Sequence, residues 1–402
     1  MRDMMRSLIW GNRTCRLAWT LLQARQTERL YRKRRDYYHK QIGNPSLEQT
    51  RSAIANRLAL RGIHPRKLKV GKVHTFAFIP QNAWHEQLLP DLSELGPLSL
   101  FDYRALGYDE WDFYNPRRWN QKRIKKRTEM TAAMTAAFTR IHSESPVDWA
   151  FFYGGGQEVE AKAINQLSAR HKVPFVDMTF DDKQGWSGRS CGDHCTGTRD
   201  ITANFDAFFT SSRVACGWHA AHGGRGVYMP EGVDCGFYCP IERKHDIAVS
   251  FVGSAYGFRR DAIEYLRQFG LEIECYGTGW RNGPAENPSD IYNRSKVVLG
   301  MGGIGYSEGL TNLKGRDFEV PAAGGGVYVT SFNPELAEHF VIGKEIACYR
   351  TRDEMLEQVR YYLENSDKAA EMSKRARIRS LQEHRWLHRY VFMLRELGFT
   401  LE

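Results

Sequence analysis

Residues 313–329, LKGRDFEVPAAGGGVYV, place a short helix directly before a buried strand. The segment Asp317–Ala323 predicts a helix, and Gly324 stands where a left-handed C-terminal cap belongs. The apolar run Val327–Thr330 follows at once and predicts a strand that is buried on both faces. A helix joined to a buried strand by so short a turn is typical of an α/β protein with a parallel sheet.

The same alternation of apolar runs and helices continues on both sides of this stretch. We expect strands at 75–79, 98–102, 149–153, 174–178, 207–210 and 227–229, and after the segment PEGVDCGFYCP again at 247–252, 272–276, 297–301, 327–330 and 346–349. Arg352–Glu364 predicts one of the intervening helices, because its apolar residues recur at helical spacing. Two such series separated near residue 231 predict two Rossmann-like domains.

Glycines collect at the expected carboxyl ends of these strands, where open parallel sheets bind their ligands. Gly253 and Ser254 end one strand, Gly277 and Gly302 follow two others, and Gly154–Gly156 ends a strand in the first series. Glycines at equivalent positions suggest a backbone that approaches a ligand closely. None of them is a GxGxxG that opens the first helix of a βαβ unit, and none is GxxxxGK[ST], so a dinucleotide oxidoreductase and a P-loop NTPase are both disfavoured.

The charged residues that open the helix at 317 are typical of an anion site. Lys314 and Arg316 flank its N-terminus, where backbone amides and the macrodipole favour a phosphate. Glu319 lies one turn inside and could hold a vicinal diol, such as a nucleotide ribose, by two hydrogen bonds. The alternative is a simple ion pair of Arg316 with Glu319 or Glu335.

Composition is that of an ordinary globular chain. Hydrophobic residues make up 42% and charged residues 26% of a chain of 402 residues, which is long enough for two or three domains. No run of about 18 apolar residues occurs, and the apolar N-terminal stretch is interrupted by Arg13 and Arg16, so we expect neither a membrane span nor secretion. Eight scattered cysteines favour a reducing compartment.

Residues 1–42 carry much of the net charge of +10. They contain eleven Lys or Arg and three acidic residues, with apolar side chains interspersed. This combination favours an anionic membrane surface or an anionic acceptor as the partner, with nucleic acid as the less favoured one. A solvated helix face is the alternative that needs no partner.

Cysteines and histidines also cluster between residues 191 and 239. The cluster consists of Cys191, His194, Cys195, Cys216, His219, His222, Cys235 and Cys239. Its spacing does not reproduce the paired CxxC pattern of structural zinc sites, so we expect no metal, while a zinc site stays the open alternative.

Six segments of the C-terminal half occur in a familiar order. They are DIAVSFVGS (246–254), ECYGTGW (274–280), YNRSKVVLGM (292–301), LKGRDFEVPAAGG (313–325), GKEIACY (343–349) and EHRWLHR (383–389). Together they resemble the group-1 glycosyltransferases of the spore-maturation, CgeB-like type. The resemblance implies an α/β GT-B fold, with two facing Rossmann-like domains and parallel sheets. The nucleotide-sugar donor would bind the C-terminal domain and the acceptor the N-terminal one.

The chain is expected to divide into four parts. Residues 1–65, which have no counterpart in the family, would form a basic helical N-terminal extension, and the resemblance implies an acceptor domain at 66–240 and a donor domain at 241–383. Residues 384–402 would form a C-terminal helix that packs back toward the N-terminal domain.

Ten residues are expected to bind the donor. The resemblance implies that Glu319 holds the ribose, that Gly253, Ser254 and Arg259 face the diphosphate, and that Tyr276, Gly277 and Trp280 lie near the base, with Asn312, Lys314 and Arg316 completing the set. Tyr276 and Trp280 could equally be core aromatic residues. Where the relatives carry a second Glu beside the sugar, this chain has Thr311, so the stereochemical outcome is left open.

Sugar transfer requires a stabilised leaving diphosphate and an oriented acceptor hydroxyl. The basic residues of the donor site could supply the first without a metal or a cofactor other than the donor itself. For the second, the best candidates for a base are Asp181 and Asp182, followed by Glu158.

The expected function is a glycosyltransferase of the cytoplasm or of the inner membrane face, acting on a cell-envelope glycan or a lipid-linked acceptor. The alternatives are a glycosyltransferase that modifies nucleic acid and a non-catalytic protein that binds nucleotide sugars or assists assembly.

Overall fold

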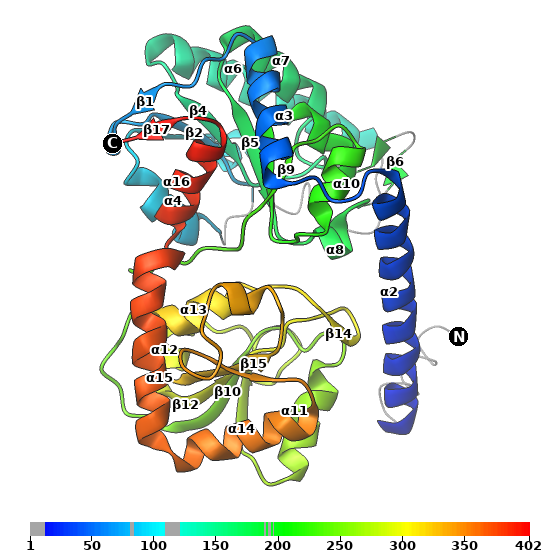
Figure 1. Ribbon diagram of the computed structural model, residues 1–402, viewed down its shortest axis with the longest axis vertical. Coiled ribbons are helices and arrows are strands. Elements are labelled where there is room, and N and C mark those ends of the chain that lie inside the picture. The colour runs from blue at the N-terminus through cyan, green and yellow to red at the C-terminus, as the bar shows by residue number, and fades with distance from the viewer. Residues whose placement is uncertain (1–12, 81–83, 109–120, 189, 192–193, 196) are drawn as a thin grey trace. The chain divides into compact units, whose positions relative to one another are not determined.

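The computed structural model describes residues 13–80, 84–108, 121–188, 190–191, 194–195 and 197–402 (Figure 1). The chain divides into two compact units. We call them the six-stranded unit, which holds residues 35–232 and 386–402, and the five-stranded unit, which holds residues up to 34 and residues 233–385.

The six-stranded unit is built on a parallel sheet with the strand order β3-β2-β4-β5-β8-β9. Its strands are β2 (Thr75–Phe78), β3 (Leu98–Leu100), β4 (Trp149–Phe152), β5 (Phe175–Thr179), β8 (Ala207–Thr210) and β9 (Gly226–Tyr228). Two short pairs, β1 (Lys67–Leu68) with β17 (Thr400–Leu401) and β6 (Ser190–Cys191) with β7 (His194–Cys195), lie outside this sheet.

Helices cover both faces of the six-stranded sheet. They are α3 (Leu47–Leu60), α4 (His85–Ser93), α6 (Gln121–Glu144), α7 (Ala161–His171), α8 (Asp182–Gly185), α9 (Thr198–Ile201), α10 (Ala215–Ala221) and α16 (Trp386–Glu396). Successive residues of β2 enter opposite cores, since Phe76 packs with residues of α6 and α7 and Ala77 with residues of α3, α4 and α16. Burial on both faces explains why these strands are continuous apolar runs.

The five-stranded unit repeats this plan with the parallel strand order β11-β10-β12-β15-β16. Its strands are β10 (Ile247–Val252), β11 (Ile273–Tyr276), β12 (Ser295–Leu299), β15 (Val327–Ser331) and β16 (Ala347–Tyr349), with an antiparallel hairpin of β13 (Gly303–Ile304) and β14 (Ser307–Thr311). Its helices are α11 (Arg259–Gln268), α12 (Pro288–Arg294), α13 (Arg316–Ala323), α14 (Arg352–Glu364) and α15 (Ser366–Arg379).

The predicted elements are present. All eleven predicted strands occur in the two large sheets, with ends that differ by at most two residues, and the predicted helix at 352–364 is α14. Gly324 caps α13 with a φ of 71°, in the left-handed region that favours glycine. The α/β class and the parallel sheets are therefore confirmed, while the predicted domain boundaries stay a prediction.

The basic N-terminal segment contains one long helix, α2 (Arg13–Gln41). Residues 13–34 of this helix belong to the five-stranded unit and its last residues to the six-stranded unit. No helix in the described part of the chain is long and apolar enough to cross a membrane.

Candidate functional site

Two arginines meet over one aromatic ring at the carboxyl end of β10. The guanidinium carbon of Arg316, from the start of α13, lies 5.2 Å from the ring centroid of Phe251. That of Arg259, from the start of α11, lies 5.7 Å from the same centroid. Gly253 leaves the space for this approach, because a Cβ built there would lie 2.7 Å from Nη1 of Arg316.

Two nitrogens of the half-buried Arg316 guanidinium are enclosed without a hydrogen bond to any described residue. Among the described residues, its Nε and Nη2 have no hydrogen-bond partner. Neither Glu319 nor Glu335, the alternative partners, bonds to these two atoms. An unsatisfied buried charge is costly to a fold, so such a group is expected where a ligand of opposite charge binds.

Arg259 experiences the charge of Arg316 directly. Burial, together with that neighbouring charge, lowers the pKa of Arg259 from its usual 12.5 to about 9. Its Nη1 donates to the carbonyl oxygen of Ser254 at 3.2 Å, which holds the side chain against the turn that follows β10. Two close guanidinium groups form a site that an anion with several oxygens would relieve.

A backbone hydrogen bond joins the ends of β10 and β11 next to these arginines. The Gly253 amide donates to the carbonyl oxygen of Tyr276 at 2.7 Å. A Cβ on Gly277 would lie 2.5 Å from the carbonyl carbon of Gly253, so only glycine fits there. The structure thus brings five of the predicted donor-site residues together: Gly253, Ser254, Arg259, Gly277 and Arg316.

The two predicted base-contacting aromatic residues have structural partners. Trp280 donates from Nε1 to the carbonyl oxygen of Gly253 at 2.7 Å, and its ring contacts Phe251 edge-on. Tyr276 is half-buried and its hydroxyl donates to Glu274, while burial raises its pKa to about 12. Trp280 therefore fixes the turn at Gly253, whatever else it contacts.

Glu319 lies among tyrosine hydroxyls. Its Oε2 accepts a hydrogen bond from Tyr292 of α12 at 3.2 Å, and Tyr238 also bonds to the carboxylate. Burial raises the pKa of Glu319, opposed by the charge of Arg316. A carboxylate has about four acceptor positions, so these bonds leave room for a diol.

Asp317 is a structural residue of this site that sequence reasoning missed. Its Oδ2 accepts from the Lys314 amide at 2.8 Å, and its Oδ1 accepts from the Tyr328 hydroxyl at 2.7 Å. Burial raises the pKa of Asp317. Asp317 therefore shapes the turn that carries Lys314. The predicted donor-site residue Asn312 is buried just before this turn, and its backbone amide donates to the carbonyl oxygen of Gly302. The sequence signal for this role was an aspartate three residues after Lys314, followed by a strand that contains Tyr328.

In the six-stranded unit, the two adjacent aspartates have different environments. The Asp182 side chain has no solvent exposure and accepts hydrogen bonds from Thr198, from Thr210 at 2.7 Å and from His219 at 3.0 Å. Because three buried donors occupy its oxygens, Asp182 serves the fold, and we do not retain it as a base. Asp181 is exposed and precedes α8.

Two buried acids hold the glycine turn that ends β4. Glu158 accepts from the Gly155 amide at 2.8 Å, and burial raises its pKa to about 7. Asp177 of β5 accepts from the Gly154 amide at 3.2 Å, and burial raises its pKa well above the usual value. The second oxygen of Asp177 is buried with no hydrogen-bond partner among the described residues. Sequence reasoning missed Asp177 because it lies within an apolar strand.

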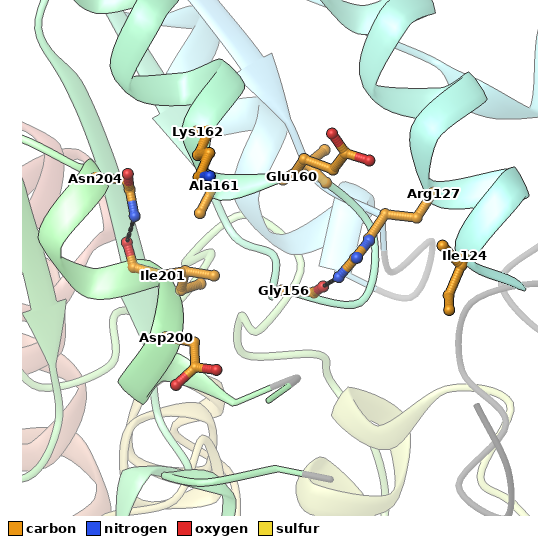
Figure 2. A pocket seen from close by; sticks show the side chains of 10 residues that line it. Ile124, Arg127, Gly156, Glu160, Ala161, Lys162, Asp200, Ile201 and Asn204 are labelled. Carbon is orange, nitrogen blue, oxygen red and sulfur yellow. Dashed lines mark hydrogen bonds between the residues drawn. The ribbon is translucent and has the colours of Figure 1, made fainter. Parts of the chain in front are cut away.

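A cavity of about 510 Å³ lies beside this turn. Figure 2 shows Arg127 reaching to Gly156, whose carbonyl oxygen it bonds at 2.9 Å. The lining combines apolar and charged side chains: Ile124, Arg127, Gly156, Val159, Glu160, Ala161, Lys162, Asp200, Ile201 and Asn204. Its size and mixed lining suit a small polar molecule or one end of a larger ligand.

The cysteine and histidine cluster contains no metal-ligand set in the described residues. No group of three potential ligands occurs there. His219 bonds to Thr202 and Asp182, and His222 to Tyr38. The side chains of Cys191, His194 and Cys195 lie outside the described residues.

Residues 259–395 match a family described as glycosyl transferase-like. A glycosyltransferase from Rickettsia africae is similar over 81% of this chain and 99% of its own, with 9% identity and a TM-score of 0.56. The sucrose-phosphate synthase of Thermosynechococcus elongatus is similar over 81% and 99%, with 12% identity and a TM-score of 0.50. No curated protein matches the sequence. The chain has a glycosyltransferase fold of the GT-B type.

Proposed function

We propose that this protein transfers a sugar from a nucleotide-sugar donor to an acceptor hydroxyl, as a group-1 glycosyltransferase of the CgeB-like type. One observation carries the proposal: the Arg316 guanidinium, two nitrogens of which have no hydrogen-bond partner among the described residues, lies beside Arg259 at the carboxyl end of β10. This is the edge at which open parallel sheets bind ligands. The glycosyltransferase fold supports the same conclusion.

The donor diphosphate would lie against these two arginines. Both guanidinium groups can bond phosphate oxygens in a bidentate manner, and Gly253 allows the backbone to come close. During transfer the bond from sugar to diphosphate breaks and the diphosphate gains negative charge. Fixed positive groups in a site with little water stabilise that charge, so we propose that no metal and no cofactor other than the donor is needed.

The nucleoside would extend from the diphosphate toward Glu319. Its carboxylate, held by Tyr292 and Tyr238, would accept both hydroxyls of the ribose. In this arrangement the tyrosines orient the carboxylate and Arg316 lowers the cost of keeping it charged. Lys314 and Asn312 would complete the site from the turn that Asp317 shapes.

The acceptor would bind the six-stranded unit at the cavity beside Gly156. Arg127 and Lys162 supply positive charge there, and Ile124 and Ile201 supply apolar surface. This lining suits a cell-envelope glycan or a lipid-linked acceptor that carries an anionic group. Asp181 and Glu158 remain the proposed bases. Buried free cysteines support a reducing, cytoplasmic location.

A panel of nucleotides tests the proposal. Uridine, guanosine, adenosine and cytidine diphosphates and their sugar conjugates would be screened by thermal shift, and the stabilising conjugate would be assayed for release of its diphosphate. We expect one base to raise the melting temperature, since a ligand at about 100 times its Kd stabilises by about 2.7 kcal/mol. Diphosphate release that increases with an added glycan acceptor would establish transfer. Binding without release would favour the non-catalytic alternative, and no binding would refute the proposal.

A further inference from the structure

Helix α2 docks on the five-stranded unit through polar side chains. Arg16 forms an ion pair with Asp261 of α11 at 2.9 Å, and its other nitrogen contacts Glu264. The side chains of Arg16 and Asp261 are only 12% and 3% exposed, so this pair is largely removed from water. Thr20 adds a hydrogen bond to Asp261 at 3.4 Å.

A second set of contacts lies farther along the same helix. Glu28 accepts a hydrogen bond from Ser307 of β14. A Cβ on Gly305, between β13 and β14, would lie 3.6 Å from Thr27. Arg16, Thr20 and Thr27 recur at helical spacing and therefore share one face. We call it the docked face of α2.

The other side of α2 exposes leucines. Leu21 is 61% exposed and Leu22 is 60% exposed. In an ordinary surface helix the apolar residues face the core and the charged residues face water. Here the relation is reversed, because Arg16 and Glu28 face the protein while the leucines face outward.

The docking contacts prevent the helix from turning its leucines inward. Rotation about the helix axis would separate Arg16 from Asp261 and leave a buried carboxylate with less compensation. It would also remove the bond from Ser307 to Glu28. Leu21 and Leu22 are thus held in solvent by contacts made elsewhere on the same helix.

Basic side chains follow these leucines on the outward side. Arg25, Arg29, Arg32 and Lys33 are exposed, and none of them forms an ion pair within the residues that the structure describes. The outward side therefore presents an apolar patch and then a basic patch. We call it the outward face of α2, defined by Leu21, Leu22, Arg25, Arg29, Arg32 and Lys33.

We propose that the outward face of α2 docks on an anionic membrane surface. Leucines that enter the headgroup boundary, next to basic residues that meet anionic lipids, are the combination by which interfacial helices bind. A second copy of the chain fits less well, because pairing two outward faces would bring like charges together. Nucleic acid would use the basic patch but gain nothing from the leucines.

Vesicle flotation tests the proposal on the full-length chain. Wild type should float with vesicles of phosphatidylcholine mixed with phosphatidylglycerol and much less with phosphatidylcholine alone. Leu21→Ser/Leu22→Ser should weaken binding to the anionic vesicles by about tenfold, because the apolar patch is lost. Arg29→Glu should weaken it by a similar factor, about tenfold, and added salt should weaken wild type in the same way.

Two control variants test whether a loss of vesicle binding is specific to the outward face of α2. Leu60→Ser removes a leucine that is 88% exposed on α3, and Lys374→Glu reverses an exposed charge on α15; both should leave flotation unchanged. All variants should keep the melting temperature of wild type, since the substituted side chains are exposed.

Three outcomes would overturn the inference. The first is wild type that ignores anionic vesicles. The second is leucine variants that float like wild type, with binding of single-stranded DNA lost only on charge reversal, which would indicate nucleic acid. The third is a wild-type dimer that Leu21→Ser/Leu22→Ser dissociates, without vesicle binding. None of these bears on nucleotide binding, so the proposed function would stand or fall by its own test.

Discussion

The two units differ in the charged side chains that lie near the carboxyl ends of β10 and β4. In the five-stranded unit, two nitrogens of the half-buried Arg316 have no hydrogen-bond partner among the described residues. In the six-stranded unit, Glu158 and Asp177 are buried with raised pKa values. Buried nitrogens without hydrogen bonds and buried acids with raised pKa values each lower the stability of the fold. The arginines near β10 suit an anionic ligand, and Glu158 near β4 can exchange a proton near neutrality.

The comparison also separates charges that serve the fold from charges that lack a partner. Asp182 is as buried as Asp177, yet it is surrounded by donors from Thr198, Thr210 and His219. Asp177 has one oxygen without such a donor in the described residues. Satisfied buried charges should therefore matter for stability, and unsatisfied ones for function.

The largest expected effect follows from removing a satisfied charge. Asp182→Ala should lower the free energy of unfolding by about 3 to 5 kcal/mol, because three buried donors lose their acceptor. Asp181→Ala, at an exposed position, should change it by less than about 0.5 kcal/mol. Urea denaturation measures both. A folded Asp182→Ala protein of normal stability that cannot transfer sugar would instead make Asp182 the base.

A smaller effect, dependent on pH, is expected at Glu158. Its folded pKa of about 7 exceeds the usual 4.5, so the folded state holds its proton more tightly than the unfolded state. The stability that this proton contributes is fully present below pH 4.5 and is lost as the pH rises to about 7, with a slope of up to about 1.4 kcal/mol per pH unit.

The variant Glu158→Gln should abolish this slope and be more stable than wild type at pH 8. Stability measured between pH 5 and pH 8 is the readout, with Glu160→Gln, a half-buried neighbour, as the matched control. Identical pH profiles for wild type and Glu158→Gln would show that Glu158 titrates normally.

The smallest of the three effects is expected for the ribose contact. Glu319→Gln keeps the shape of the side chain and removes its charge, so it should weaken a nucleoside and its diphosphate equally, by about 1.5 kcal/mol. Calorimetric titration measures both affinities. Unchanged affinity in a folded variant would remove Glu319 from the donor site and leave it as an acceptor for Tyr292 and Tyr238.

The sequence was sufficient for features that depend on near neighbours. The helix and glycine cap at 317–324 and the strands that follow apolar runs are decided by local propensity and by burial on both faces. The turn at Gly253 and the charges of Arg259 and Arg316 were likewise visible in the chain.

Features that depend on distant partners were not predictable from the sequence. Asp181 and Asp182 cannot be told apart in the segment FDD. Asp182 is a buried structural residue because His219, 37 residues away, bonds to it. In the same way, the side of α2 that faces the protein is set by the pair of Arg16 with Asp261, 245 residues apart. Charge pattern alone could not show that the leucines of this helix face outward.

The most direct test of the account concerns Arg316. Calorimetry would compare the best-binding nucleoside diphosphate with its parent nucleoside, in wild type and in Arg316→Ala. We predict that the variant binds the nucleoside as wild type does but loses about 2 kcal/mol or more for the diphosphate, since only the diphosphate carries the charge that Arg316 meets. Urea denaturation should accompany the titration, because the charge of Arg316 also offsets part of the cost of burying the Glu319 and Asp317 carboxylates. Equal losses for both ligands, or unchanged diphosphate affinity, would contradict the assignment of this site to the donor diphosphate.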